Sequence, residues 1–145
     1  MTRFLYDTAV FVYAFGGEHQ YREPCREIVA MAGRSELRGE ASVDLLQEFM
    51  HQRLRRTGDR RLAASQARQV ATLCALHEVR SEDLGRAIDL FERSPSLNAR
   101  DGVFVALMRD REIPAILSPD RDFDDVEGLT RVDPADRDAV RALAL

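Results

Sequence analysis

The segment SPDRDFDD, residues 118–125, concentrates negative charge directly after a short apolar run. Four of its eight residues are aspartates, and like charges this close repel one another unless a cation or a basic group compensates them. The preceding run IPAILS, residues 113–118, has the composition of a buried strand, so the aspartates begin where that strand should end. Two interpretations follow: the segment is a solvated turn, or it forms one wall of a metal site.

The alternate spacing of Asp120, Asp122 and Asp124 is also that of a calcium-binding loop. Such a loop needs glycine at its sixth position and a bidentate glutamate at its twelfth. Here those positions hold Asp125 and Arg131, so we reject a calcium loop. We expect Asp124 and Asp125 to face solvent or to cap a helix.

Three other acids could share a site with Asp120. Asp7 follows the apolar residues FLY, Asp101 falls in the first turn of one predicted helix, and Glu48 lies on another. Each has an ordinary structural explanation: a helix cap for Asp7, the helix dipole for Asp101 and a solvated helix face for Glu48. Together with Asp120, however, they offer only oxygen ligands, which select hard cations such as Mg²⁺ or Mn²⁺.

The composition narrows the chemistry further. All 21 basic residues are arginine, so Schiff-base catalysis, a lysine-anchored cofactor and a P-loop are excluded. The net charge of −4 argues against nucleic-acid binding by overall charge, although a local basic patch can suffice. An acid-lined site in a lysine-free chain fits metal-dependent cleavage of a phosphodiester.

The length of 145 residues predicts a single domain, residues 1–145, with one sizeable core. Cys25 and Cys74 have no partner at metal-ligand spacing and are expected to be reduced thiols. The sequence has no apolar run long enough to span a membrane and no signal-peptide pattern, which favours the cytoplasm and predicts no membrane partner.

Hydrophobic periodicity and capping residues predict short strands that alternate with helices. In the helix over 43–56 we expect Val43, Leu46, Met50 and Leu54 to form the buried stripe and Ser42 to be the cap. Apolar strands separated by helices indicate a parallel sheet covered on both faces, with its site beyond the carboxyl ends of the strands. The predicted strands are 3–6, one within 37–42, 113–118 and 129–133, and the predicted helices are 23–31, 43–56, 62–77, 82–94, 98–111 and 133–144.

Three blocks of the sequence resemble the PIN-domain ribonucleases, and more narrowly the VapC-type toxins of toxin–antitoxin pairs. They are FLYDTAVFVYA, ASVDLLQEFMHQRL and LNARDGVFVALMRDREIPAILSPDRDFDDVEGLTRVDP, so the resemblance runs from Phe4 to about Pro134. It implies a three-layer α/β/α PIN-like domain with a central parallel sheet. It also implies a Mg²⁺- or Mn²⁺-dependent endoribonuclease, the toxin of a type II pair, in which a metal-bound water attacks the RNA.

The resemblance assigns roles to particular residues. The catalytic quartet falls on Asp7, Glu48, Asp101 and Asp120, and Asp122 joins Asp7, Asp101 and Asp120 as a metal ligand. One departure is the D-T-A sequence at residues 7–9, where Ala9 replaces the asparagine that the family commonly carries, and this could loosen the site. The four carboxylates remain, so we expect activity to survive.

Substrate contacts are expected from two sources. By the resemblance, Ser42 and Ser118 occupy hydroxyl positions beside the acids. The arginine-rich segment HQRLRRTGDRR includes Arg53 and Arg55, which could bind the RNA backbone. The alternative for these arginines is a solvated helix end that complements its own dipole.

The resemblance further implies two protein partners: a small antitoxin whose tail enters the cleft, and a second copy of this chain in a homodimer. Two other hypotheses remain open at this point. One is a non-catalytic PIN-like module that binds RNA or protein, for which Ala9 is the only hint. The other is a receiver-like signalling domain, against which the absence of lysine and the scatter of acids over four elements both argue.

Overall fold

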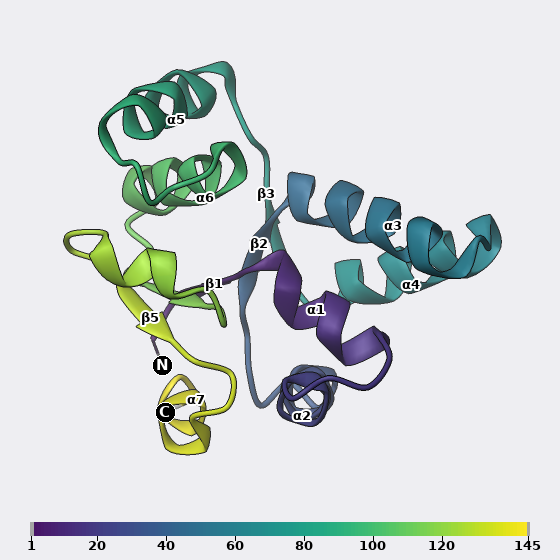
Figure 1. Cartoon of the computed structure of the whole chain (residues 1–145). Helices are drawn as coiled ribbons and strands as arrows, with labels where there is room; N and C mark the ends of the chain where they lie inside the picture. Colours follow the sequence, from purple (N-terminus) through teal and green to yellow (C-terminus); the bar gives the residue numbers. More distant parts are fainter. Residues whose placement is uncertain (1, 145) are drawn as a thin grey trace.

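Five short parallel strands form the centre of the molecule, in the order β3-β2-β1-β4-β5 (Figure 1). The computed structural model describes residues 2–144. The chain first builds outward from β1 in one direction and then returns to add β4 and β5 on the other side, so the order reverses between β1 and β4. Crevices at such a reversal are where open α/β sheets bind ligands. The strands are Phe4–Tyr6 (β1), Glu40–Ser42 (β2), Ala75–His77 (β3), Ala115–Leu117 (β4) and Thr130–Val132 (β5).

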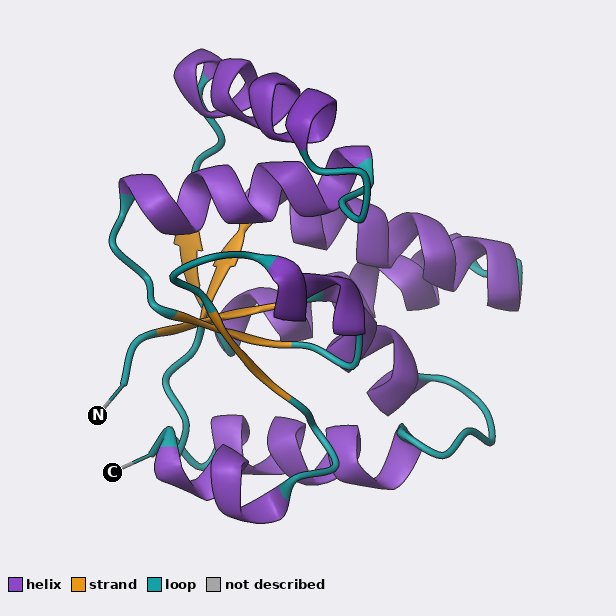
Figure 2. Ribbon diagram, turned by 60° about the vertical axis from the view of Figure 1, so that its left-hand side comes forward, coloured by secondary structure: helices purple, strands orange, loops and turns teal. Residues whose placement is uncertain are grey.

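Helices cover both faces of this sheet. Figure 2 shows α5 and α6 on one side and α2 and α7 on the other, and two separate apolar clusters fill the two interfaces. This arrangement confirms the predicted three-layer α/β/α fold. The helices are Thr8–Phe15 (α1), Arg22–Gly33 (α2), Val43–Thr57 (α3), Arg60–Thr72 (α4), Ser81–Arg93 (α5), Ala99–Asp110 (α6) and Arg137–Ala142 (α7), with a 3₁₀ helix at Arg121–Asp125 (η1).

The alternation of side chains in the strands decides which residues enter which core. In β1, Phe4 and Tyr6 pack in the cluster that contains residues of α1, α2 and α3, whereas Leu5 packs in the cluster that contains residues of α5 and α6. Successive side chains of a strand point to opposite faces. The same alternation leads to Asp7, which therefore continues toward the face that α5 and α6 cover.

One predicted helix was wrong at its end. Residues 62–77 were expected to form a single helix, but α4 ends at Thr72 and residues 75–77 form β3. The alanine-rich sequence has no glycine or proline to mark the change, so local preference favours a continuous helix. What decides the strand is pairing with β2, in which Glu40 lies opposite Ala75 and Ser42 opposite His77.

The buried stripe predicted for α3 was also wrong. Leu45, Phe49 and Arg53 are buried, whereas Val43 and Met50 are exposed. The buried face of α3 is therefore rotated about the helix axis from the predicted one. The reason is that α3 packs against both α1 and α4.

The last helix begins later than predicted. Asp136 caps α7 by accepting from the backbone N–H of Ala139 at 3.1 Å, so residues 133–135 lie outside the helix. Asp133 instead accepts from the backbone N–H of Ala135 in a turn. Both cysteines are free thiols, as predicted, and no helix within residues 2–144 is long and apolar enough to cross a membrane.

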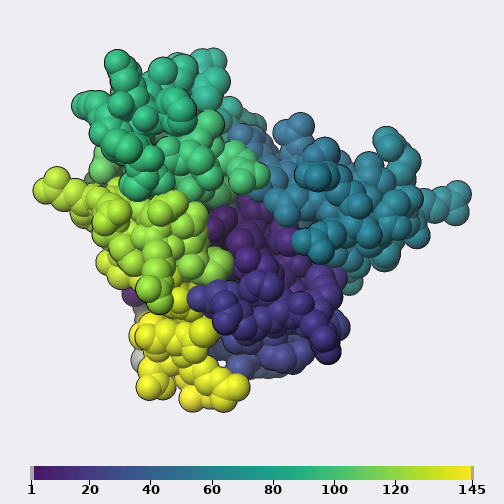
Figure 3. Space-filling view, viewed as in Figure 1, coloured from purple at the N-terminus to yellow at the C-terminus, as the bar shows by residue number. Residues whose placement is uncertain are grey.

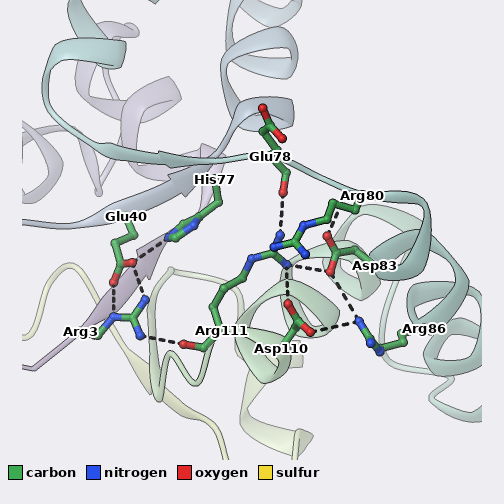
Figure 4. Close-up of polar contacts among 9 residues, drawn as sticks. All are labelled: Arg3, Glu40, His77, Glu78, Arg80, Asp83, Arg86, Asp110 and Arg111. Atoms are coloured by element: carbon green, nitrogen blue, oxygen red, sulfur yellow. Dashed lines mark hydrogen bonds and ion pairs between the residues drawn. The ribbon is translucent and has the colours of Figure 1, made fainter.

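A network of arginines and acids ties the sheet to α5 and α6 (Figure 4). Arg3 donates two hydrogen bonds to the Glu40 carboxylate, at 2.9 and 2.7 Å, and a third to the carbonyl of Arg111 at 2.7 Å. His77 lies 2.7 Å from the same carboxylate. Strands β1, β2 and β3 are thus joined to the C-terminal end of α6.

The second half of this network joins α5 to the end of α6. Arg111 donates to Asp83 at 2.7 Å and to the carbonyl of Glu78 at 2.8 Å, and Asp83 also accepts from the backbone N–H of Arg80 (Figure 4). Asp83 is almost fully buried. A buried acid with two donors keeps its charge at little cost, so this network belongs to the framework of the fold.

Candidate active site

Asp7 lies at the point where β1 becomes α1. Its carboxylate accepts from the backbone N–H of Ala9 at 3.4 Å and so caps the helix, while its own N–H donates to the carbonyl of Leu117 in β4. The Ser118 hydroxyl donates to the other carboxylate oxygen at 2.5 Å. The two interpretations of this residue are therefore compatible: it caps a helix and also stands at the junction of two strands.

Ser118 connects Asp7 to the second strand-end acid. Its hydroxyl is fully buried and accepts from the backbone N–H of Asp120 at 3.0 Å while it donates to Asp7. The Asp120 carboxylate in turn accepts from the N–H of Asp122 at 2.9 Å and begins η1. Ser118 therefore holds the chain that follows β4 against the end of β1.

The acids of SPDRDFDD have different surroundings. Asp120 lines the cleft described below, whereas Asp122 is exposed on η1. Asp124 receives two hydrogen bonds from Arg131, at 2.8 and 3.3 Å, and Asp125 is exposed. Part of the segment is thus a solvated turn and part lies at the wall of a cleft.

Asp101 reaches the same place from α6. Asn98 caps this helix by accepting from the N–H of Asp101 at 2.8 Å, which fixes the first turn. At Gly102 the helix approaches α5 so closely that a Cβ atom would lie 3.2 Å from the carbonyl of Ala87. The Asp101 side chain is buried, and its Oδ2 atom has no hydrogen-bond partner.

Glu48 comes from α3 and has three polar neighbours. Its carboxylate accepts from the Thr8 hydroxyl at 3.2 Å and from the Gln52 side chain at 3.0 Å, and it forms an ion pair with Arg100. Arg100 precedes Asp101 in α6, so this ion pair connects the helix of one acid to the helix of another. In this structure the Arg100 guanidinium therefore neutralises the Glu48 carboxylate.

These elements enclose a cleft of about 520 Å³ whose lining includes all four acids of the predicted quartet. Figure 3 shows the segments that carry them, α1, α3, α6 and the residues after β4, meeting on one face of the molecule. Ala9, Asn98 and Arg56 also line the cleft. The quartet is Asp7, Glu48, Asp101 and Asp120.

The acids of this cleft disturb one another. Burial, together with the charges of Asp7, Asp120 and Asp122, raises the pKa of Asp101 from 3.8 to about 7, although Arg100 offsets part of the rise. Burial likewise raises the pKa of Asp7, against the hydrogen bonds from Ser118 and Ala9, and the charges of Glu48 and Asp120 raise it further. The arginines that line the cleft therefore do not compensate the negative charge of its carboxylates.

A divalent cation fits this donor set in its chemistry. Carboxylate oxygens are the preferred ligands of Mg²⁺ and Mn²⁺, and the unpartnered buried Oδ2 atom of Asp101 is a free ligand atom. Among residues 2–144, however, no three His, Cys, Asp or Glu side chains converge closely enough to hold an ion as they stand. Asp120 serves as a cap, so its carboxylate would have to turn before it joined Asp7 and Asp101 around an ion, whereas Glu48 is held by Arg100.

The four residues predicted to contact substrate lie in different surroundings. Ser42 is fully buried and caps α3 by accepting from the N–H of Leu45, which confirms its predicted capping role. Ser118 is buried between Asp7 and Asp120. Arg53 is buried and donates to Gln66 of α4, while Arg55 is exposed on the last turn of α3. Of these four, Arg55 alone is exposed.

Several residues of the cleft were missed in the sequence. Arg100 lines the cleft and Thr8 donates to Glu48 at its wall. Each stands next to a predicted acid, so adjacency to Asp101 and to Asp7 was an available signal. Tyr13, His19 and Tyr21 also line the cleft, and no local pattern connects them. They meet because the loop that joins α1 to α2 folds back toward α1.

Comparison with known proteins is consistent with this geometry. The PIN domain family matches residues 4–129. Ribonuclease VapC7 of Mycobacterium tuberculosis is 35% identical over 130 residues, which are 88% of this chain and 89% of the relative.

Solved structures share the fold at low sequence identity. VapC20 of Mycobacterium tuberculosis, described as a sarcin–ricin loop cleaving toxin, has a TM-score of 0.69 at 18% identity and covers 85% of this chain and 93% of its own. A toxin–antitoxin complex from Klebsiella pneumoniae has a TM-score of 0.65 at 14% identity and covers 92% and 98%. The family match and the 35% identical relative carry the assignment: the chain belongs to the PIN-domain family and, within it, to the VapC type.

Proposed function

We propose that this chain is a metal-dependent endoribonuclease and the toxin of a type II toxin–antitoxin pair. The observation that carries the proposal is the cleft in which acids from four separate elements meet, with Asp101 buried, its Oδ2 atom unpaired and its pKa raised to about 7. Its VapC7 relative is named a ribonuclease. Membership of the PIN family sets aside a receiver-like signalling domain.

Mg²⁺ or Mn²⁺, when bound, would supply a water of lowered pKa and neutralise charge on the phosphodiester. We assign its ligation to Asp7, Asp101 and Asp120, with Asp122 beside them. The burial of Asp7 and Asp101 and the mutual repulsion of these acids favour a cation that removes the repulsion. Glu48 completes the catalytic quartet at the wall that α3 forms.

The chain's other residues act on position and charge. Ser118 holds Asp7 against Asp120 through two hydrogen bonds, and Thr8 orients Glu48. Arg56 and Arg100 line the cleft and are placed to contact RNA phosphates. We keep Arg55 as a phosphate contact outside the cleft, whereas burial favours a framework role for Ser42 and Arg53.

The direct test is Mn²⁺-dependent cleavage of a mixed cellular RNA pool by the wild type and by Asp101→Asn. This substitution keeps the shape of the side chain and removes one ligand charge. The proposal expects the wild type to cut a small set of RNAs, and the variant to leave them intact. Sequencing the new RNA ends then identifies the substrate.

A non-catalytic PIN-like module remains the alternative function, and Ala9 is the residue that favours it. Ala9 lines the cleft but offers only its backbone N–H, which donates to Asp7. If the folded wild type binds Mn²⁺ but cuts no RNA, while Ala9→Asn does cut, the native chain is such a module.

We also propose a small antitoxin as partner, supported by the toxin–antitoxin complex among the structures of the same fold. The expected result is that the tagged chain copurifies with a protein encoded by a neighbouring gene, and that this protein suppresses RNA cleavage. Full activity of the chain in the presence of every neighbouring gene product would contradict this part of the proposal.

The third part of the proposal is a homodimer, and α5 has a surface that could form its interface. Leu84, Ile88 and Phe91 follow one another at helical spacing and are each more than half exposed. Apolar side chains grouped in this way indicate a protein contact. Sedimentation of Ile88→Glu should give a monomer where the wild type gives a dimer, and a monomeric wild type would contradict the assignment.

A further inference from the structure

Three aromatic rings stack beside the acids of the cleft. Tyr13, at the end of α1, lies 4.2 Å from His19 between ring centroids, with an angle of 15° between the planes. Tyr21 is nearly parallel to both, at 5.8 Å from Tyr13 and 6.0 Å from His19, with angles of 23° and 20°. Tyr13 belongs to α1, whereas His19 and Tyr21 belong to the segment that joins α1 to α2 (Figure 1).

Hydrogen bonds hold the rings in these orientations. The backbone N–H of Tyr21 donates to His19 Nδ1 at 3.1 Å, which fixes the imidazole on the loop. The Tyr21 hydroxyl donates to Asp133 at 3.0 Å, and Arg131 donates to the same oxygen at 3.3 Å. A loop built only to connect two helices does not need its aromatic side chains oriented in this way.

The position of the stack sets it apart from core packing. His19 is exposed and Tyr13 and Tyr21 are half-buried, so the rings border solvent. All three line the acid cleft, and Tyr13 and His19 also line a second hollow of about 350 Å³. The two hollows adjoin, because both are lined by Tyr13, His19, Val12 and Arg56.

The second hollow has the chemistry of a path for a nucleic-acid backbone. Arg56, which is exposed, contributes positive charge to it, the buried Arg53 and Glu18 also line it, and Gly16 and Gly17 contribute backbone without side chains. Because Arg56 lines both hollows, an RNA strand held in the acid cleft would lie beside the rings and Arg56 together. Parallel aromatic rings next to positive charge are how proteins hold unpaired bases.

We propose that Tyr13, His19 and Tyr21 form a stacking subsite for an unpaired base of the RNA, beside the scissile phosphodiester. The substrate is then cut in a single-stranded region, where a base is free to leave its neighbours and stack on protein. This inference rests on the proposed ribonuclease function and deepens it. Its strongest single residue is His19, because it is exposed and stacks on Tyr13.

The test measures RNA binding separately from cleavage. All variants are made in an Asp101→Asn background, and their affinity for a short single-stranded RNA is compared with their affinity for an abasic strand of the same length and charge. His19→Ala removes the outer ring, and His19→Phe keeps a ring in its place. His51→Ala is the matched control, since it removes an exposed histidine of α3 that lies outside both hollows.

We expect His19→Ala to bind the single-stranded RNA about ten-fold more weakly, as the loss of one base stack predicts. His19→Phe and His51→Ala should bind like the background protein, and the affinity for the abasic strand should not change in any variant. An RNA that carries 2-aminopurine should show fluorescence quenching on binding, and His19→Ala should lose that quenching.

Equal weakening of normal and abasic strands would overturn the subsite, because it would mean that the ring only holds the loop in place. Unchanged RNA binding together with loss of a copurifying small protein would also overturn it, in favour of a protein-docking surface. RNA cleavage by the wild type with binding that ignores His19 rejects the subsite and keeps the ribonuclease. Ring-dependent binding without any cleavage by the wild type rejects the ribonuclease and keeps the subsite.

Discussion

The two ends of α6 lie beside buried acids in opposite electrical surroundings. At its first turn, Asp101 lies among Asp7, Asp120 and Asp122, and one of its oxygens has no partner. Just beyond its last turn, Arg111 donates to Asp83, which is as deeply buried. One end of α6 therefore places an unpaired acid in the cleft, and the other end places an arginine against a buried acid of α5.

Burial alone does not explain the difference, as Asp7 and Glu40 demonstrate. Both residues are 8% exposed. Burial raises the pKa of Asp7, and the hydrogen bonds it accepts offset only part of that rise. Burial would also raise the pKa of Glu40, but hydrogen bonds from Arg3 and His77 outweigh it and leave the pKa below its usual value.

The two ends of α6 differ in whether the unfavourable free energy of a buried acid is offset by an arginine. The chain has arginines enough to pair buried acids, and at the C-terminal end of α6 it does so. At the N-terminal end it leaves like charges together, which disfavours folding unless a further cation arrives. The cleft therefore leaves its acids short of positive charge, whereas the network neutralises its own acids and joins the sheet to α5 and α6.

The largest expected effect is on catalysis, and it should appear at one end only. Removing the charge of Asp101 with Asn should lower kcat/KM for RNA by at least about 10²-fold, because several kcal/mol of stabilisation by a bound metal depends on it. The same change at Asp83 should alter kcat/KM by less than about three-fold, since that charge is neutralised within the framework. Steady-state cleavage of one labelled RNA measures both variants. A similar loss at Asp83 would mean that the network also shapes the active site.

For stability the order of the two positions should reverse. Asp83→Asn removes the buried charge that lies closest to the Arg111 guanidinium, which keeps only Asp110 at 3.3 Å and the Glu78 carbonyl, and breaking a buried pair costs about 3 kcal/mol. Asp101→Asn removes a charge that the folded protein disfavours, so the metal-free variant should be at least as stable as the wild type. Urea unfolding of both variants at pH 7 in the presence of a chelator checks the signs. If Asp101→Asn is the less stable of the two variants, the Asp101 carboxylate must accept a hydrogen bond or an ion pair that stabilises its charge in the folded wild type.

The dependence of stability on pH should separate the two regions next. The pKa of Asp101 is raised to about 7 in the folded state, so its contribution is fully present below about pH 4 and is lost as the pH rises through 7. The pKa of Asp83 is lowered, first by the Arg111 hydrogen bond, so its contribution is present above about pH 4 and is lost as the pH falls.

Between pH 4 and 7, the chelated wild type should therefore lose stability relative to Asp101→Asn, by on the order of 2 kcal/mol. Adding Mn²⁺ at pH 7 should restore the wild type and leave the variant unchanged. Denaturant unfolding across this pH range, with and without Mn²⁺, makes the comparison. If the free energy of unfolding changed with pH in the same way for both proteins, ionisation of Asp101 would not destabilise the folded state.

The two regions also differ in how far the sequence predicted them. Asp7 and Asp120 each follow an apolar run, and Asp101 opens a helix, so local patterns located three of the four acids of the cleft. The rule that sites lie beyond the carboxyl ends of parallel strands then brought them together. The sequence could not show that Glu48 turns to Arg100, because that contact joins residues 52 positions apart.

The network left no comparable local signal. Asp83 looks like an ordinary acid in the first turn of α5, and Arg111 like a basic residue after α6. Their pairing spans 28 positions and that of Arg3 with Glu40 spans 37. The same reason explains the missed β3 and the misplaced stripe of α3, since distant partners decide both. Tertiary contacts override local preference in each case.

The smallest expected effect distinguishes the two halves of the network from each other. Glu40→Gln removes the charge that Arg3 and His77 face, but the Arg3 side chain is 49% exposed, so solvent screens the pair. The expected loss is about 1 kcal/mol and should shrink further in 1 M salt. The loss in Asp83→Asn should resist salt, because Asp83 and Arg111 are 2% and 11% exposed. Unfolding of both variants at low and high salt tests this, and equal salt dependence would mean that water reaches Asp83 as readily as it reaches Arg3.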